Sequence, residues 1–161
     1  MNYQITTFTG EKRLIKPRLE LYSQKAFMNE DMPGIAIMLD DVTAGEHEAE
    51  PYCDLTTSFG EFIGMKNCAY IDTNNCDFAD QLLQAGIAKD TGFYKASGFC
   101  TYPLWVFDEQ FLRSSGEENY EKYSSRFDEY MKDTLDDHEY DDESEDESED
   151  EGEDESIGMN M

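Results

Sequence analysis

The stretch Ala69–Phe107, AYIDTNNCDFADQLLQAGIAKDTGFYKASGFCTYPLWVF, decides the fold, because its apolar runs alternate with turn-forming residues more cleanly than those elsewhere. Residues 68–72 predict a short strand that ends at residues favouring a turn. Residues 78–85 predict one helix, since apolar side chains recur near helical spacing and Gly86 suits its left-handed C-terminal position. Asn75 or Asp77 is expected to cap this helix, because a short oxygen-bearing side chain accepts hydrogen bonds from free amides.

The second half of the stretch predicts two turns and a strand. Thr91-Gly92 and Ser97-Gly98 have the composition of turns. Residues 99–107 form the most apolar run of the chain and predict a strand. Pro103 cannot donate a ladder hydrogen bond, so this strand is expected at a sheet edge or with a bulge.

Four more strands are predicted before this stretch, over residues 3–8, 12–22, 34–39 and 54–59. The first two alternate with period two, and Pro17 places the second at an edge or a bulge. Residues 34–39 are continuously apolar, as a buried central strand is. Residues 41–51 are polar and predict a hairpin loop.

Together these elements predict an α+β fold, a small and mostly antiparallel sheet with one helix packed on it. Composition divides the 161 residues into an α+β domain (1–112), an amphipathic helix (113–135) and a disordered acidic tail (136–161). The tail is expected to be disordered because 15 of the 20 residues in 136–155 are acidic and none is basic, which gives self-repulsion and little to bury.

Apolar side chains in the predicted C-terminal helix follow three- and four-residue steps after a capping box at Ser115–Glu118. Two interpretations are open: the stripe packs on the protein's own sheet, or it docks on a partner. The candidate partner-binding residues are Tyr120, Tyr123, Phe127 and Tyr130 of the stripe with Asp136, Asp137, Asp141, Asp142 and Glu143 of the tail.

The net charge of −26 restricts the choice of partner. Residues 1–110 hold 17 acids against 8 bases, and residues 111–161 hold 21 against 4. Direct nucleic-acid binding is disfavoured, because it requires cations along the phosphates. We expect a basic protein surface as the partner.

The bases that the body does carry gather on one predicted strand. Lys12, Lys16 and Arg18 share its outer face, with Arg13 and Lys25 nearby. This face is either an ordinary solvated strand surface or a docking surface for an anion, such as the protein's own tail.

Motifs for catalysis, metals and nucleotides are missing from the sequence. The cysteines, Cys53, Cys68, Cys76 and Cys100, form no C-x-x-C pair, and the histidines are His47 and His138. We therefore expect free, reduced thiols and no metal or other cofactor. The chain has neither a run of about eighteen apolar residues nor a secretory start, so a cytoplasmic protein with no membrane partner is expected.

The motifs Asp72-Thr-Asn-Asn75 and Ser97-Gly-Phe-Cys-Thr-Tyr-Pro103, with Gly86-Ile-Ala and Thr91-Gly92 between them, resemble those of one family. Its members are uncharacterised short proteins grouped as domain of unknown function 4313, carried on conjugative transposons and plasmids of gut bacteria. The resemblance covers about residues 34–110. It implies a genetic context and assigns no functional residue.

These observations lead to the expectation of a non-enzymatic interaction protein of a mobile element. By analogy with acidic inhibitors of nucleases, it would occupy the basic nucleic-acid-binding surface of a host-defence or DNA-processing protein. Two alternatives are an enzyme with an unfamiliar site beside Asp72, Asn74, Cys100 and Tyr102, and an acidic chaperone of basic proteins. The oligomeric state is left open by the sequence.

Overall fold

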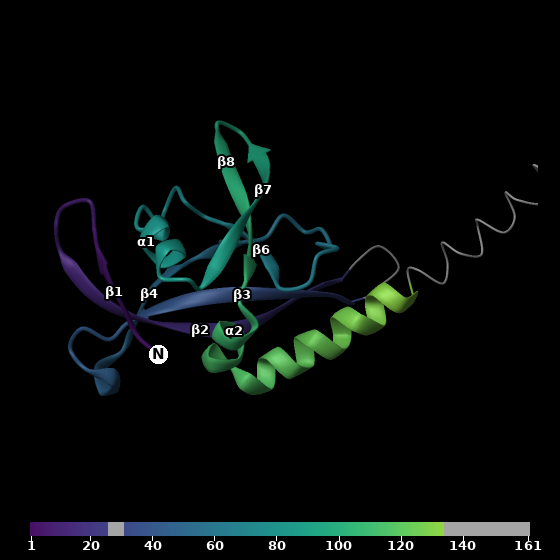
Figure 1. Ribbon diagram of the computed structural model, residues 1–161, viewed down its shortest axis with the longest axis horizontal. Coiled ribbons are helices and arrows are strands. Elements are labelled where there is room, and N and C mark those ends of the chain that lie inside the picture. Colours follow the sequence, from purple (N-terminus) through teal and green to yellow (C-terminus); the bar gives the residue numbers. More distant parts are fainter. Residues whose placement is uncertain (26–30, 134–161) are drawn as a thin grey trace, which may run out of the picture. The chain divides into compact units, whose positions relative to one another are not determined.

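The computed structural model describes residues 1–25 and 31–133. The chain divides into two compact units, Met1–Phe127 and Asp128–Met161, and the first holds both sheets. Each sheet has four antiparallel strands, and helices accompany them (Figure 1). The predicted α+β class is confirmed, with the strands divided between two sheets.

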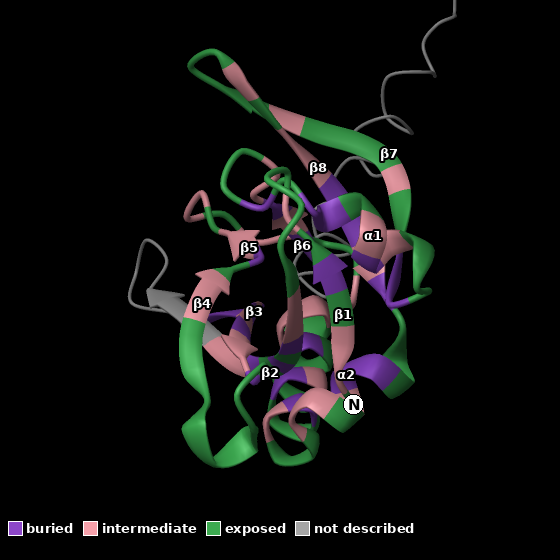
Figure 2. Ribbon diagram, turned by 90° about the vertical axis from the view of Figure 1, so that its left-hand side faces the viewer, coloured by how far each residue is buried: buried purple, intermediate pink, exposed green. Residues whose placement is uncertain are grey.

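The first sheet has the order β1-β2-β3-β4. Burial alternates along β2 and β3, so that Ile15 and Leu19 of one strand and Ile37 of the other are almost fully enclosed (Figure 2). This alternation is what a strand with one covered face requires. The elements are β1 (Tyr3–Thr6), β2 (Lys12–Lys25), β3 (Asp31–Asp41), the 3-10 helix η1 (Glu46–Glu48) and β4 (Glu50–Asp54).

The second sheet has the order β5-β6-β8-β7 and includes most of the stretch 69–107. Helix α1 follows β6 and ends before Gly86, whose φ of 90° is the left-handed conformation predicted for it. The elements are β5 (Thr56–Thr57), β6 (Cys68–Ile71), α1 (Ala79–Gln84), β7 (Ala88–Ser97) and β8 (Cys100–Phe107).

Leu55 joins the two sheets. Its amide donates to the carbonyl of Ile37 at 2.9 Å, and its carbonyl accepts from the amide of Asp72 at 2.9 Å. The strand predicted over residues 54–59 is therefore wrong, because the chain changes sheets at Leu55. The preceding strand β4 begins at Glu50, since it pairs with β3 from there and accommodates Pro51 at a shift in register.

Thr91-Gly92 is not a turn, as predicted, but a bulge inside β7. The register with β8 shifts between Asp90 and Tyr94, and Gly92 has a φ of 89°. The Thr91 hydroxyl donates to the carbonyl of Leu104 at 2.8 Å, which keeps the bulged strand attached. Strand β8 as a whole lies between β6 and β7, but β6 pairs with it only opposite Leu104 to Val106. Pro103 therefore pairs with β7 alone and occupies a local edge, one of the two positions predicted for it.

The predicted cap of α1 is absent. Phe78 is the N-cap residue and no side chain caps the helix. Instead, the Asp72 carboxylate accepts hydrogen bonds from the backbone amide of Asn75 at 3.3 Å and from its side-chain amide at 2.8 Å. This pair closes a turn between β6 and α1, so neither Asn75 nor Asp77 acts as the helix cap.

Two helices follow β8 where one was predicted. Helix α2 (Glu109–Ser115) begins with the Asp108 carboxylate accepting from the amide of Phe111 at 3.1 Å, and a second helix occupies residues 117–133. Gly116 separates them. A Cβ on Gly116 would lie 3.1 Å from that of Leu19, so the break lies directly against β2.

Candidate functional site

The β7–β8 hairpin extends beyond the rest of its sheet (Figures 1 and 2). Strand β6 pairs with β8 only opposite Leu104 to Val106, so the distal part of the hairpin is a two-stranded ribbon. Phe93 and Tyr94 are 63% and 65% exposed, and Phe99 at the turn is fully exposed. Exposed aromatic side chains are enriched at protein interfaces.

The hairpin is also the part of the sequence that lacks acids. No Asp or Glu occurs between Asp90 and Asp108, and the one base there is Lys95. Its ammonium pairs with the Glu61 carboxylate at 2.6 Å and lies 5.4 Å from the ring centroid of Phe59. Apart from the paired Lys95, the hairpin thus carries no charged side chain, on a strongly acidic protein.

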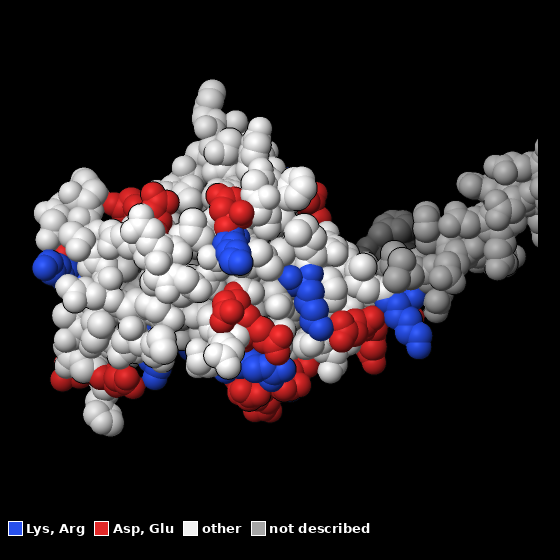
Figure 3. Space-filling model, viewed as in Figure 1, with Lys and Arg blue, Asp and Glu red and all other residues white. Residues whose placement is uncertain are grey.

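Three of the bases predicted as an anion-docking surface, Arg13, Lys16 and Arg18, are paired with the protein's own acids. Lys16 contacts Glu46 at 3.1 Å, and Arg18 lies between Asp40 at 3.1 Å and Glu20. The hydrogen bond from Arg18 to Asp40, and then the one to Glu20, raise the pKa of Arg18 above its ordinary value. Figure 3 shows blue and red side chains next to each other on the visible face.

Arg113 is paired in the same way, by three carboxylates. It contacts Glu109 at 2.9 Å, Glu117 at 2.8 Å and Glu121, and its guanidinium lies 4.8 Å from the ring centroid of Tyr120. Arg113, Lys16 and Arg18 line one groove together with some of these acids. Because each cation already has a carboxylate partner, the groove does not offer an uncompensated positive charge.

The predicted helical stripe packs on the body, the first of its two interpretations. Tyr120 and Tyr123 are each 2% exposed and Phe127 is 6% exposed. The Tyr120 hydroxyl donates to the side-chain oxygen of Asn67 at 3.0 Å. The Tyr123 hydroxyl accepts a hydrogen bond from the backbone amide of Asn67 at 2.8 Å. Asn67 has a φ of 69°.

The remaining candidate partner-binding residues lie in or next to the second unit. Tyr130 is half-buried. The predicted acidic residues Asp136, Asp137, Asp141, Asp142 and Glu143 fall outside the described residues, as does the predicted disordered tail. Partner binding by Tyr130 and by these acids stays a prediction.

The structure brings together the residues of the enzyme hypothesis. The pKa of Tyr102 is raised by partial burial, then by Cys100 and Asp72 nearby, while a hydrogen bond with Asn74 acts in the opposite direction. A raised pKa keeps the hydroxyl protonated, whereas a proton-accepting catalyst needs the reverse. Among described residues no charged side chain is buried, so this cluster is a surface feature.

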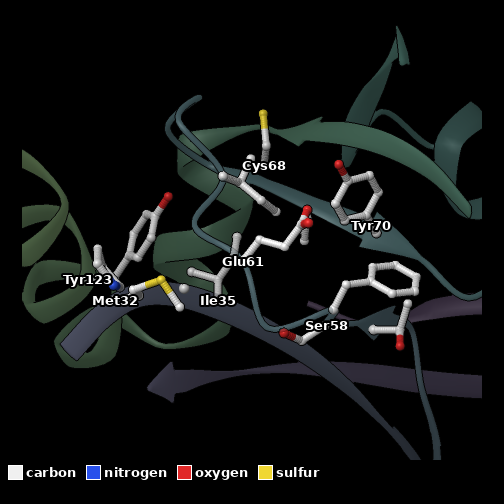
Figure 4. Close-up of a pocket in the computed structure, with 13 residues that line it drawn as sticks. Met32, Ile35, Ser58, Glu61, Cys68, Tyr70 and Tyr123 are labelled. Carbon is white, nitrogen blue, oxygen red and sulfur yellow. The ribbon is translucent and has the colours of Figure 1, made fainter. Parts of the chain in front are cut away.

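A small, partly open cavity lies between β3, β5 and β6 (Figure 4). Met32, Ile35, Cys68, Tyr70 and Tyr123 are among the side chains that line it. Its volume of about 30 Å³ suits roughly one water molecule, whereas small-molecule sites occupy about 300–1,000 Å³. The cavity is a packing defect rather than a substrate site.

Two cysteines lie side by side. The sulfur atoms of Cys53 and Cys76 are 3.3 Å apart, and Cys76 also lies 3.4 Å from the carbonyl oxygen of Asp54. Cys68 is buried, and burial raises its pKa to about 11. All four cysteines are free, and the sequence contained no local motif that would predict the proximity of Cys53 and Cys76.

Nowhere in 1–25 and 31–133 do three or more His, Cys, Asp or Glu side chains gather as potential ligands of one metal ion. No helix in these same ranges is long and apolar enough to cross a membrane.

Sequence comparison identifies one family model. The model described as Domain of unknown function (DUF4313) matches residues 19–139. The match extends beyond the resemblance seen over residues 34–110 and takes in the second half of β2 and both C-terminal helices. No curated protein and no solved structure matches the chain.

Proposed function

Because the chain belongs to the DUF4313 family, whose function is undefined, we propose from its surface that it is a non-enzymatic protein that binds a basic surface of another protein. The pairing of its bases carries the proposal. Lys16, Arg18 and Arg113 are each neutralised by nearby carboxylates, so the net charge of −26 belongs to acids that these bases do not pair. Such a surface attracts a basic partner over long range and repels phosphates.

The hairpin supplies what charge alone does not. Aromatic side chains are enriched among the residues that dominate binding energy, whereas rim charges mainly set the rate and salt dependence of association. Phe93, Tyr94 and Phe99 give such anchors. In this proposal the acids steer the partner and the hairpin holds it.

The proposed partner is a nucleic-acid-binding protein of host defence or DNA processing, because surfaces that bind phosphates are basic. The chain would then act as a cytoplasmic inhibitor encoded by a mobile element of gut bacteria. The resemblance of its D-T-N-N and S-G-F-C-T-Y-P motifs supports this context. Sequencing the genes beside other family members tests it, and a consistent absence of transfer genes would contradict it.

Competition with DNA tests the proposed function. Purified basic DNA-binding proteins of the host are loaded with fluorescent duplex DNA, and the full chain is added while anisotropy is measured. We expect release of DNA from at least one protein, weakening as salt is raised, because exposed charges are screened. Release that is independent of salt, or none from any protein of a panel covering the host's defence and DNA-processing proteins, would overturn it.

Two variants separate the hairpin from general apolar exposure. The triple variant F93S/Y94S/F99S should lower the apparent affinity by about tenfold or more, as loss of interface anchors does. F8S is the matched control, because Phe8 is 89% exposed on another turn. Equal effects of the two would remove the hairpin from the interface. Deletion of residues 136–161 distinguishes the acidic-chaperone alternative, which requires all binding to be lost with the tail.

A further inference from the structure

We propose that Cys53 and Cys76 form a thiol–disulfide exchange site, at which a small-molecule disulfide converts the two thiols into an intramolecular disulfide. Their sulfur atoms are 3.3 Å apart. A disulfide bond is about 2.05 Å long, so the sulfurs need to approach by only about 1.3 Å. This inference is independent of the proposed partner.

Both cysteines are held by hydrogen-bonded backbone. Cys53 lies in β4 opposite Leu39 of β3. Cys76 follows the Asp72–Asn75 turn, and its amide donates to the carbonyl of Asp72 at 2.9 Å. Asp72 is in turn bonded to Leu55, at the junction of the sheets. The two thiols therefore meet because the sheets are joined there, and a disulfide would link β4 to the turn before α1.

The two thiols have unequal environments. Cys53 is half-buried and Cys76 is fully buried. The hydrogen bond with Cys76 lowers the pKa of Cys53, outweighing its burial and the nearby carboxylates of Asp54, Asp72 and Asp77. The same hydrogen bond, followed by burial, raises the pKa of Cys76. Cys53 is thus the thiol that reaches the reagent, and Cys76 is the thiol that completes the bond.

The exchange runs in two steps that balance. The Cys53 thiolate attacks one sulfur of the small disulfide, and a thiolate leaves, giving a mixed disulfide on Cys53. Cys76 then gives its proton to solvent and attacks the Cys53 sulfur, expelling the second small thiolate. The two protein thiols are oxidised to one disulfide, and the small disulfide is reduced to two thiols.

Mass spectrometry of the full chain, treated with oxidised glutathione in native buffer and then alkylated, tests the site. We expect two thiols to be lost without a retained glutathione at this site, and a peptide in which Cys53 and Cys76 are joined. Cys68 should stay unmodified at least about tenfold longer, because it is buried and its pKa is raised. Absence of the joined peptide while Cys100 acquires glutathione would overturn the proposal.

Single variants assign the roles. In C76S, Cys53 should retain one glutathione, since the second step is lost. In C53S, Cys76 should stay unreacted, since it is enclosed. Equal reactivity of Cys76 in C53S and in the wild type would contradict the order of steps. Circular dichroism and a thermal melt of each variant confirm that it is folded, and a joined peptide that forms only in urea would also count against the site.

Discussion

The side-chain amide of Asn119 donates to the backbone carbonyl of Leu19 at 2.9 Å and joins positions 100 residues apart. Strand β1 pairs with β2 only as far as Ile15, so within the described part of the chain the segment around Leu19 has no neighbouring strand on that side. Ile37 lies opposite Leu19 in β3, but its carbonyl accepts from the amide of Leu55 and its amide donates to the Thr56 hydroxyl, so neither bonds Leu19. The C-terminal segment therefore covers an edge that the first sheet leaves open.

Substitution N119A is expected to destabilise the protein by about 1 kcal/mol, because the Leu19 carbonyl loses a partly buried donor. Urea unfolding followed by tryptophan fluorescence measures the change. K122A is the control, since Lys122 is exposed and its contact with Glu118 is 3.7 Å long. Equal stability of N119A and K122A would show that the bond contributes nothing.

Substitution G116A should destabilise the protein by about 1–3 kcal/mol, through overpacking against β2. The new Cβ would lie 3.1 Å from the Leu19 Cβ and 3.2 Å from its carbonyl oxygen, and neither atom is at the end of a flexible side chain. G64A is the matched control, because the nearest atom to its Cβ, in Phe62, is 3.9 Å away. The midpoints of urea unfolding for the two variants decide the matter, and a G116A midpoint at or above that of G64A would contradict the close approach.

The two tyrosines that contact Asn67 should differ in a hydrogen-exchange experiment. Y123F removes the acceptor of the Asn67 amide, whereas Y120F removes only a donor to its side chain. We expect faster exchange of the Asn67 amide in Y123F alone. Y123F should lose about 1–3 kcal/mol, because it leaves a partly buried donor unsatisfied, and Y120F about 1 kcal/mol. Unchanged exchange in Y123F would mean that another group protects this amide.

Lowering the pH should remove the contribution that the ionised Asp41 side chain makes to the stability of the folded protein. Partial burial acts to raise its pKa, but hydrogen bonds from Thr43 and then the pairing with Arg13 outweigh it and leave the pKa below the ordinary value. A lowered folded-state pKa stabilises the protein above the unfolded value of about 3.9, and this stabilisation disappears as the pH falls through the folded pKa.

The wild type and D41N should therefore differ most in unfolding free energy near neutral pH and converge below about pH 4. Urea unfolding at a series of pH values measures the difference, and the comparison cancels the effect of the other carboxylates. D80N, which changes an exposed acid on α1, serves as the control. A difference that stays constant with pH would contradict the lowered pKa.

Local patterns in the sequence predict the elements whose geometry is set by neighbours in the chain. Period-two alternation predicts β2, and the spacing before Gly86 predicts α1 to within one residue at each end. Patterns of this kind do not report pairing between distant residues. The transfer of the chain between sheets at Leu55 depends on hydrogen bonds to Ile37 and Asp72, so residues 54–59 read as one strand.

The site residues follow the same division. The buried stripe of Tyr120, Tyr123 and Phe127 is visible as helical periodicity, but its target, Asn67, is more than fifty residues away. The exposure of Phe99 had a local signal, since a residue within the turn after Gly98 has no neighbouring strand to cover it. The pairing of Cys53 with Cys76 had none, because 23 residues separate them and two sheets bring them together.

The cover that Asn119 and Gly116 provide for β2 has a consequence during synthesis. At about 5–20 residues per second, the ribosome needs about 5–20 s to add the 100 residues that separate Leu19 from Asn119. For that time the nascent strand has an open edge on which another chain could pair. Pro17 lies within this open segment and cannot donate a ladder hydrogen bond. It therefore hinders pairing with another chain, and so aggregation, until the C-terminal helices have been synthesised.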